Sequence, residues 1–178
     1  MIWLYVGLAL VGLGGMYWQE SFGALIPEEP ILMLHHIVVG IAGGLFLILA
    51  SRGLEKIVPS VETLTQGFGQ MLGQFTPRHA CLAAVASSLG EEIFFRGFLQ
   101  SWWGVLASSV VFALLHIGPD RRFISWPFLA FGASLLLGSL MVYTGTIWAS
   151  VIAHGLVNFV NLNHIQARAA AQQLTQQA

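Results

Sequence analysis

Two adjacent glutamates and an arginine lie in a stretch of the chain that is otherwise almost entirely apolar. They are Glu91, Glu92 and Arg96, in the segment Ser87-Ser88-Leu89-Gly90-Glu91-Glu92-Ile93-Phe94-Phe95-Arg96-Gly97. The chain has only eight acids and seven bases in 178 residues. Ionisable groups inside a membrane span cost roughly 2.5–3.5 kcal/mol each and usually serve a function. Because Glu92 and Arg96 are spaced i, i+4 and can form a structural ion pair, we assign chemistry to Glu91.

Two further pairs of residues have the same spacing. They are Phe112 with His116, and His154 with Asn158. Side chains four positions apart lie on one face of a helix, and polar faces within a membrane turn toward each other or toward a water-filled cavity. We expect Phe112 to pack against the site. The sequence therefore predicts a bundle interior that holds a carboxylate, two imidazoles and a carboxamide.

These polar groups divide into two chemical roles. Glu91 and His116 could hold a water molecule and take its proton, as a general base does. His154 and Asn158 could donate hydrogen bonds to a carbonyl oxygen as it gains negative charge. The combination predicts a hydrolase for a peptide bond reached from within the membrane.

The composition indicates an integral membrane protein. Hydrophobic residues make up 56% of the chain and charged residues 8%, whereas soluble domains carry roughly 25% charged residues. The net charge of −1 and the absence of a basic block argue against a nucleic-acid partner. One cysteine cannot form an internal disulfide, and no Cys/His spacing typical of a zinc site is present.

Apolar runs predict an all-α fold, a polytopic membrane bundle of about six transmembrane helices in a single domain, residues 1–178. The expected spans are about 2–18, 31–50, 79–99, 104–117, 123–143 and 146–162, and an amphipathic helix over 61–75 would lie along the interface. Trp3 and Tyr5 at one end of the first span are typical of a membrane–water interface.

The basic residues predict the orientation of the bundle, because cytoplasmic loops are enriched in Lys and Arg. With six spans and both termini in the cytoplasm, every base outside the spans falls on the cytoplasmic side. These bases are Arg52, Lys56, Arg78, Arg121, Arg122 and Arg168. The lipid bilayer and a membrane protein or peptide substrate are the expected partners.

The motifs Glu91-Glu92-x-x-x-Arg96, Phe112-x-x-x-His116 and His154-x-x-x-Asn158 occur in this order. Together they resemble the signature motifs of the CAAX protease and bacteriocin-processing (CPBP) family, which includes the type II CAAX prenyl endopeptidases. The resemblance covers about residues 79–163, the expected catalytic core.

This resemblance implies a metal-independent intramembrane glutamate protease. Glu91 and His116 would activate water, His154 and Asn158 would form the oxyanion hole, and Glu92 would be a supporting residue, as would Arg96. Similar members are mostly bacterial inner-membrane proteins. The chain is shorter than the prenyl-processing members, so a leader peptide, a small membrane peptide or a signalling protein is also an expected substrate.

Three other interpretations stay open. Ser134, in Gly132-Ala133-Ser134, and His154 are similar to the nucleophile and base of rhomboid serine proteases. Glu91, His116 and His154 could form a three-ligand zinc site. The third interpretation is a non-enzymatic membrane scaffold or bacteriocin self-immunity protein, in which the polar cluster is structural.

Overall fold

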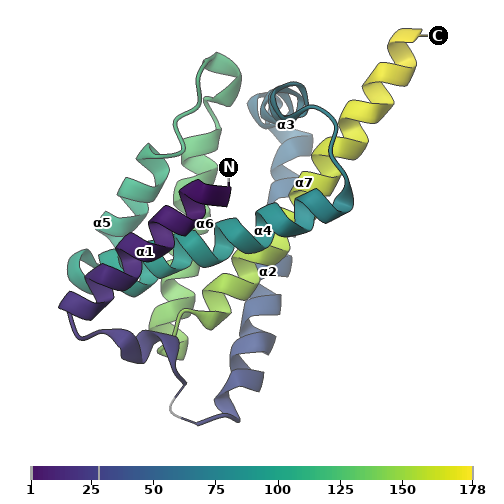
Figure 1. Cartoon of the computed structure of the whole chain (residues 1–178). Coiled ribbons are helices and arrows are strands. Elements are labelled where there is room, and N and C mark those ends of the chain that lie inside the picture. Colours follow the sequence, from purple (N-terminus) through teal and green to yellow (C-terminus); the bar gives the residue numbers. More distant parts are fainter. Residues whose placement is uncertain (1, 28, 178) are drawn as a thin grey trace.

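The chain is a bundle of helices in the computed structural model, which describes residues 2–27 and 29–177; residues 1, 28 and 178 of the predicted single domain lie outside the described residues. The elements are α1 (Ile2–Trp18), η1 (Phe22–Leu25), α2 (Leu32–Ile57), α3 (Pro59–Leu72), α4 (Pro77–Glu92), η2 (Ile93–Leu99), α5 (Gln100–Leu114), η3 (Arg121–Phe123), α6 (Trp126–Thr144) and α7 (Trp148–Gln177) (Figure 1). The predicted all-α class is confirmed.

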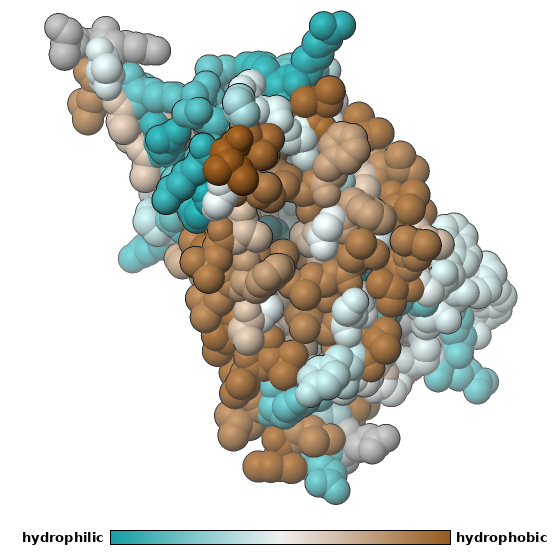
Figure 2. All heavy atoms as spheres, turned by 180° about the vertical axis from the view of Figure 1, so that it is seen from behind, coloured by the Kyte–Doolittle hydropathy of each residue, from teal (hydrophilic) through white to brown (hydrophobic). Residues whose placement is uncertain are grey.

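Within the part of the chain that the structure describes, three helical stretches are long and apolar enough to cross a membrane: Leu32–Ile57, Pro77–Leu114 and Arg121–Thr144. Helix α1 is apolar but shorter, with 17 residues. Seen from behind, apolar side chains form a broad belt and hydrophilic side chains gather above it (Figure 2). This distribution is that of a membrane helical bundle.

The predicted boundary between the third and fourth spans corresponds to a break inside α5. Gly104 has a φ of 76°, a conformation that glycine adopts without steric cost. The residues before it continue the line of α4 and η2, and those after it form the next helix. In contrast, the last helix extends beyond the expected membrane span, because α7 continues from near residue 162 to Gln177.

Helix α3 is the predicted amphipathic helix, at Pro59–Leu72 instead of 61–75. Proline suits the first turn of a helix, and Gly73, with a φ of 63°, ends it. Polar bonds hold it at one end of the bundle: Arg168 Nη2 lies 2.9 Å from Glu62 Oε1, and Arg122 Nη1 lies 2.6 Å from Gln70 Oε1.

The short loop before α6 is fixed by an exposed aspartate. The Asp120 carboxylate accepts hydrogen bonds from the Arg122 backbone, at 2.9 Å, and from its guanidinium, at 2.7 Å from Nη2. The Arg122 side chain holds the pKa of the Asp120 carboxyl below its ordinary value. Because Arg122 also binds α3, this loop connects α3 to the start of α6.

Helix α1 packs directly on the helix that carries the acidic motif. A Cβ added at Gly12 would lie 2.8 Å from the Phe94 Cα, and one added at Gly90 would lie 2.5 Å from the Tyr5 carbonyl oxygen. Only glycine allows backbones to approach so closely. The acidic motif itself crosses from α4 into η2, a π-helical segment of seven residues. Such segments often occur at functional sites.

Candidate active site

The two adjacent glutamates point in different directions. Successive residues of an α-helix project about 100° apart, so only one of them can face a given side. Glu91 lines a cavity and is 9% exposed. Glu92 points into the protein and is 0% exposed. The helix thus separates a carboxylate that a substrate can reach from one that it cannot.

Glu92 connects two helices through a buried polar network. Its Oε2 lies 3.1 Å from Arg96 Nε, and its Oε1 lies 2.7 Å from His154 Nδ1 on α7. Arg96, also 0% exposed, donates from Nη2 to the Ser134 carbonyl and hydroxyl oxygens, each at 3.2 Å. The sequence predicted the Glu92–Arg96 pair but not its bond to His154. Glu92 therefore orients an imidazole as well as pairing with Arg96.

The hydrogen bond to Glu92 determines which nitrogen of His154 faces the cavity. An ionised carboxylate only accepts hydrogen bonds, so Nδ1 of His154 donates to Glu92. The other nitrogen, Nε2, lies 3.9 Å from Oε2 of Glu91. That Glu91 oxygen is buried and has no hydrogen-bond partner among the described residues.

The charges of this cluster nearly balance. With both glutamates ionised and Arg96 protonated, the net charge is −1, and one more proton on Glu91 or on His154 makes the cluster neutral. Burying a net charge costs several kcal/mol, because the ion loses its hydration. This balance favours one further proton in the cluster, on Glu91 or on His154, whose Oε2 and Nε2 atoms lie 3.9 Å apart.

His116 is held by its neighbour Phe112. Its Nδ1 lies 2.6 Å from the Phe112 carbonyl oxygen, and the two rings stack with centroids 4.2 Å apart. A carbonyl only accepts, so Nδ1 carries the proton and Nε2 of the neutral ring has a free lone pair. The Phe112 ring also lies 5.2 Å from the Arg96 guanidinium. His116 is therefore arranged as a base, and Phe112 separates it from the buried charges.

Asn158 lies one turn beyond His154 on α7 and uses one of its amide hydrogens. Its Nδ2 donates to the Ser87 hydroxyl at 3.0 Å, and Ser87 in turn donates to the Ala84 carbonyl at 3.2 Å. The second hydrogen on Nδ2 is available for a ligand. Ser87 stands in the quoted acidic segment, but no sequence pattern indicated its partner, because the bond joins α4 to α7.

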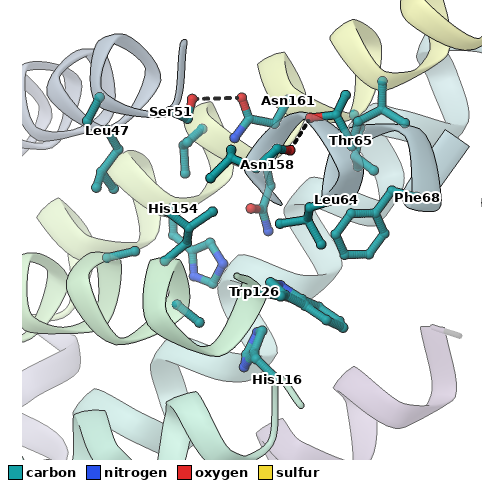
Figure 3. Close-up of a pocket in the computed structure, with 18 of the residues that line it drawn as sticks. Leu47, Ser51, Leu64, Thr65, Phe68, His116, Trp126, His154, Asn158 and Asn161 are labelled. Carbon is teal, nitrogen blue, oxygen red and sulfur yellow. Dashed lines mark hydrogen bonds between the residues drawn. The ribbon is translucent and has the colours of Figure 1, made fainter. Parts of the chain in front are cut away.

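Glu91, His116, His154, Asn158 and Phe112 line one cavity of about 610 Å³. The close-up shows the imidazole of His154 and the amide of Asn158, both on α7, with the imidazole of His116 below them (Figure 3). The other walls are largely apolar and come from α2, α3 and α6. The structure brings these five sequence-predicted residues together and places Glu92 and Arg96 outside the cavity.

Tyr5 and Trp126 are among the cavity residues that were not predicted as part of the site. Tyr5, expected at the membrane interface, lines the cavity and is close enough to Glu91 for an electrostatic interaction. Trp126 also lines it and packs edge-to-face on His116. Both come from helices without a motif, so spacing along the sequence could not reveal them.

The structure also bears on the other two catalytic interpretations. Ser134 is 0% exposed and its hydroxyl donates to Ser109 at 3.0 Å, behind Arg96 and away from the cavity, which disfavours a serine nucleophile. Among residues 2–27 and 29–177, no three His, Cys, Asp or Glu side chains are grouped as metal ligands.

Residues 74–160 match the family described as type II CAAX prenyl endopeptidase Rce1-like. The sporulation-killing factor biosynthesis protein SkfC of Bacillus subtilis (strain 168) is 28% identical over 168 residues, which cover 85% of this chain and 33% of SkfC. The uncharacterized protein YpbD of the same organism is 26% identical over 149 residues, which cover 82% of this chain and 77% of YpbD.

The chain thus spans about a third of the length of SkfC. No solved structure matches the chain. The family match includes all three motifs, and the resemblance stated from those motifs is confirmed at this level. Residues 74–160 of the chain are thus similar to the Rce1-like family of type II CAAX prenyl endopeptidases.

Proposed function

We propose that this protein is an intramembrane endopeptidase that hydrolyses a peptide bond of a membrane-associated protein or peptide with an activated water. One observation carries the proposal: Glu91 from α4, His116 from the turn after α5, and His154 and Asn158 from α7 line the same cavity. A base, a second proton acceptor and two amide or imidazole donors are the groups that peptide hydrolysis needs.

In this mechanism Glu91 and His116 act on the water. The water oxygen attacks the carbonyl carbon while its proton passes to the carboxylate of Glu91 or to Nε2 of His116, which the Phe112 bond leaves unprotonated. The attack converts the carbonyl oxygen into an oxyanion. When the C–N bond breaks, the same proton goes to the leaving amine, so that the products are a carboxylic acid and an amine.

The oxyanion would be stabilised by α7. Asn158 has a free amide hydrogen, and His154 can donate from Nε2 only when its ring carries a second proton. That imidazolium would lie between Glu91 and Glu92 and would make the buried cluster neutral. We infer that Glu92 and Arg96 support catalysis by keeping His154 oriented and charged.

The apolar walls of the cavity support a hydrophobic substrate segment. Leu47 on α2 and Leu64 and Phe68 on α3 face the polar groups across the cavity (Figure 3). We propose a substrate that is a membrane protein, a leader peptide or a small membrane peptide, prenylated or not. We also propose a bacterial inner membrane location, with both termini and the polar end that includes α3 in the cytoplasm.

The test compares terminal peptides by mass spectrometry in membranes that contain the wild-type protein or the Glu91→Gln variant at matched abundance. The variant keeps the shape of the side chain and removes the base. New termini that occur only with wild type are expected, and His116→Ala should abolish them as well. A host that makes the natural substrate is needed, so the native membrane is the appropriate source.

The second candidate is a non-enzymatic scaffold or self-immunity protein, for which the same polar network would serve packing. One relative is named as a sporulation-killing factor biosynthesis protein, so binding to a killing factor is a role that can be tested for this chain. The Glu91→Gln variant separates the two: a binding protein keeps its phenotype, whereas a protease loses it.

Inhibition of cleavage by a fluorophosphonate would instead support a serine nucleophile. Loss of cleavage with a chelator, restored by zinc, would support a metalloprotease.

A further inference from the structure

The position of His116 needs support from outside its own helix. His116 lies two residues beyond the end of α5, in the turn before Gly118 and Pro119. A side chain in such a turn lacks the neighbours that the next turn of a helix would supply. The bond to the Phe112 carbonyl fixes one ring nitrogen, and the stacked Phe112 ring covers one face.

Trp126 supplies the missing contact. Its ring meets the His116 ring at 84°, with centroids 5.1 Å apart, which is an edge-to-face pair. Trp126 is the first residue of α6, so its backbone is fixed by the helix. Trp126 lies beside His116 (Figure 3), and Phe112 stacks on one face of the imidazole, so the two aromatic rings restrict its orientation.

Trp126 is itself held by α3. The Phe68 ring meets the Trp126 ring at 87°, with centroids 4.8 Å apart, and meets Phe123 at 85° and 5.1 Å. Phe68 and Trp126 both line the cavity. The contacts form a continuous aromatic chain from α3 through Trp126 to His116.

We propose that Trp126, held by Phe68, is a positioning residue for His116, so that α3, which precedes the segment matched by the family, completes the active site. The inference rests on the proposed function only where activity is measured. In chemical terms, the position of α3 against the bundle determines the direction of the lone pair on Nε2 of His116.

The first arm of the test measures catalysis with a purified protein and a synthetic peptide that spans the bond identified in the membrane experiment. Displacement of a catalytic group by about 1 Å can cost on the order of 100-fold, so Trp126→Leu should lower kcat by roughly 10- to 100-fold with little change in KM. Phe68→Leu, which removes one aromatic pair, should lower kcat by about 2- to 10-fold.

Two further variants distinguish positioning from general damage. Trp126→Phe keeps an aromatic ring beside His116 and should recover most of the kcat lost in Trp126→Leu. It also takes the place of Trp126→Leu in the test if that variant does not fold. Trp103→Leu removes the same side chain at a half-exposed position outside the cavity and should keep the wild-type rate. Equal losses in Trp103→Leu and Trp126→Leu would overturn the inference.

The second arm needs no substrate. Diethyl pyrocarbonate acylates a free imidazole nitrogen, and peptide mass spectrometry reads the extent at each histidine. Trp126→Leu and Phe68→Leu should change the labelling rate of His116 several-fold, while the exposed His79 keeps its rate as an internal reference.

The two arms separate the two hypotheses. A wild-type protein that cleaves nothing, with His116 labelling that depends on Trp126, refutes the proposed protease and retains the positioning inference. A wild-type protein that cleaves its peptide, with Trp126→Leu unchanged in kcat and in labelling, overturns the inference and leaves the protease intact.

Discussion

Replacing Arg96 by methionine tests the buried network most directly. Arg96 is 0% exposed, pairs with Glu92 at 3.1 Å and donates twice to Ser134 at 3.2 Å. Methionine is flexible and fills much of the same space without a charge. The substitution leaves the Glu92 carboxylate fully buried with His154 as its one remaining polar partner among the described residues.

The expected cost is large because a buried charge loses its counterion. Removing one member of a buried pair destabilises a protein by about 3–5 kcal/mol, and a folded domain is stable by only about 5–15 kcal/mol. Arg96→Met should therefore strongly reduce the amount of folded protein. The double variant Glu92→Gln/Arg96→Met removes both charges, and such replacements are often neutral, so its stability should return toward wild type.

Activity should not return with stability. In the double variant, the glutamine that replaces Glu92 keeps an acceptor for His154 but removes the carboxylate 2.7 Å from Nδ1. Only the Glu91 carboxylate, 3.9 Å from Nε2, is left to stabilise a second proton on that ring. If His154 is an oxyanion donor, its loss costs about 2.7–4 kcal/mol, or roughly 100- to 1,000-fold in kcat. The double variant is thus expected to be folded and nearly inactive.

The assay is a fluorescent-protein fusion, heated in detergent and analysed by size exclusion, which gives a midpoint for loss of the folded peak. Terminal-peptide mass spectrometry at matched abundance gives the activity. If Arg96→Met alone is as stable as the wild type, the argument that Glu92 needs Arg96 as its counterion is refuted. A double variant with wild-type activity would refute the role of Glu92 in charging His154.

The remaining predictions concern the donor on α7, the packing of α1 and metal dependence. Asn158→Ala should lower kcat by roughly 100-fold or more, and Ser87→Ala, which removes the acceptor that holds the Asn158 amide, should lower it less, as kinetics on the identified peptide will measure. Gly12→Ala should lower the thermal midpoint, because overpacking costs about 1–3 kcal/mol and the new Cβ would meet the Phe94 backbone. Gly14→Ala on the same helix meets nothing within 4 Å and should be neutral or slightly stabilising; a loss equal to that of Gly12→Ala would contradict the packing argument. Treatment of the purified protein with a chelator should leave cleavage unchanged, and a loss that zinc reverses would favour the metalloprotease.

Much of the fold could be predicted from the sequence because membranes impose a simple rule. Apolar runs long enough to cross a bilayer must be helical, since their backbone groups have no water to bind. Composition and such runs predicted the all-α bundle and an amphipathic helix over 61–75, whereas the structure begins α3 at Pro59 and ends it before Gly73. The span expected over 146–162 is only the first part of α7, because the polar C-terminal half of this helix has no membrane-like pattern.

The candidate site could be predicted in part for a similar reason. The i, i+4 spacing of Phe112 with His116, and of His154 with Asn158, is a local property of a helix and is visible in the sequence. Polar groups in an apolar helix must face inward, and the structure places Glu91 and these four residues around one cavity.

Only the tertiary structure decided which groups meet. The bond from Glu92 to His154, the serine oxygens around Arg96 and the contact of Trp126 with His116 join residues that are far apart in the sequence. Helix spacing determines the face on which a side chain lies, but the partner on the facing helix depends on crossing geometry, which close backbone approaches such as that at Gly90 set. The sequence therefore determined which residues point inward, and the packing of the helices determined what each of them does there.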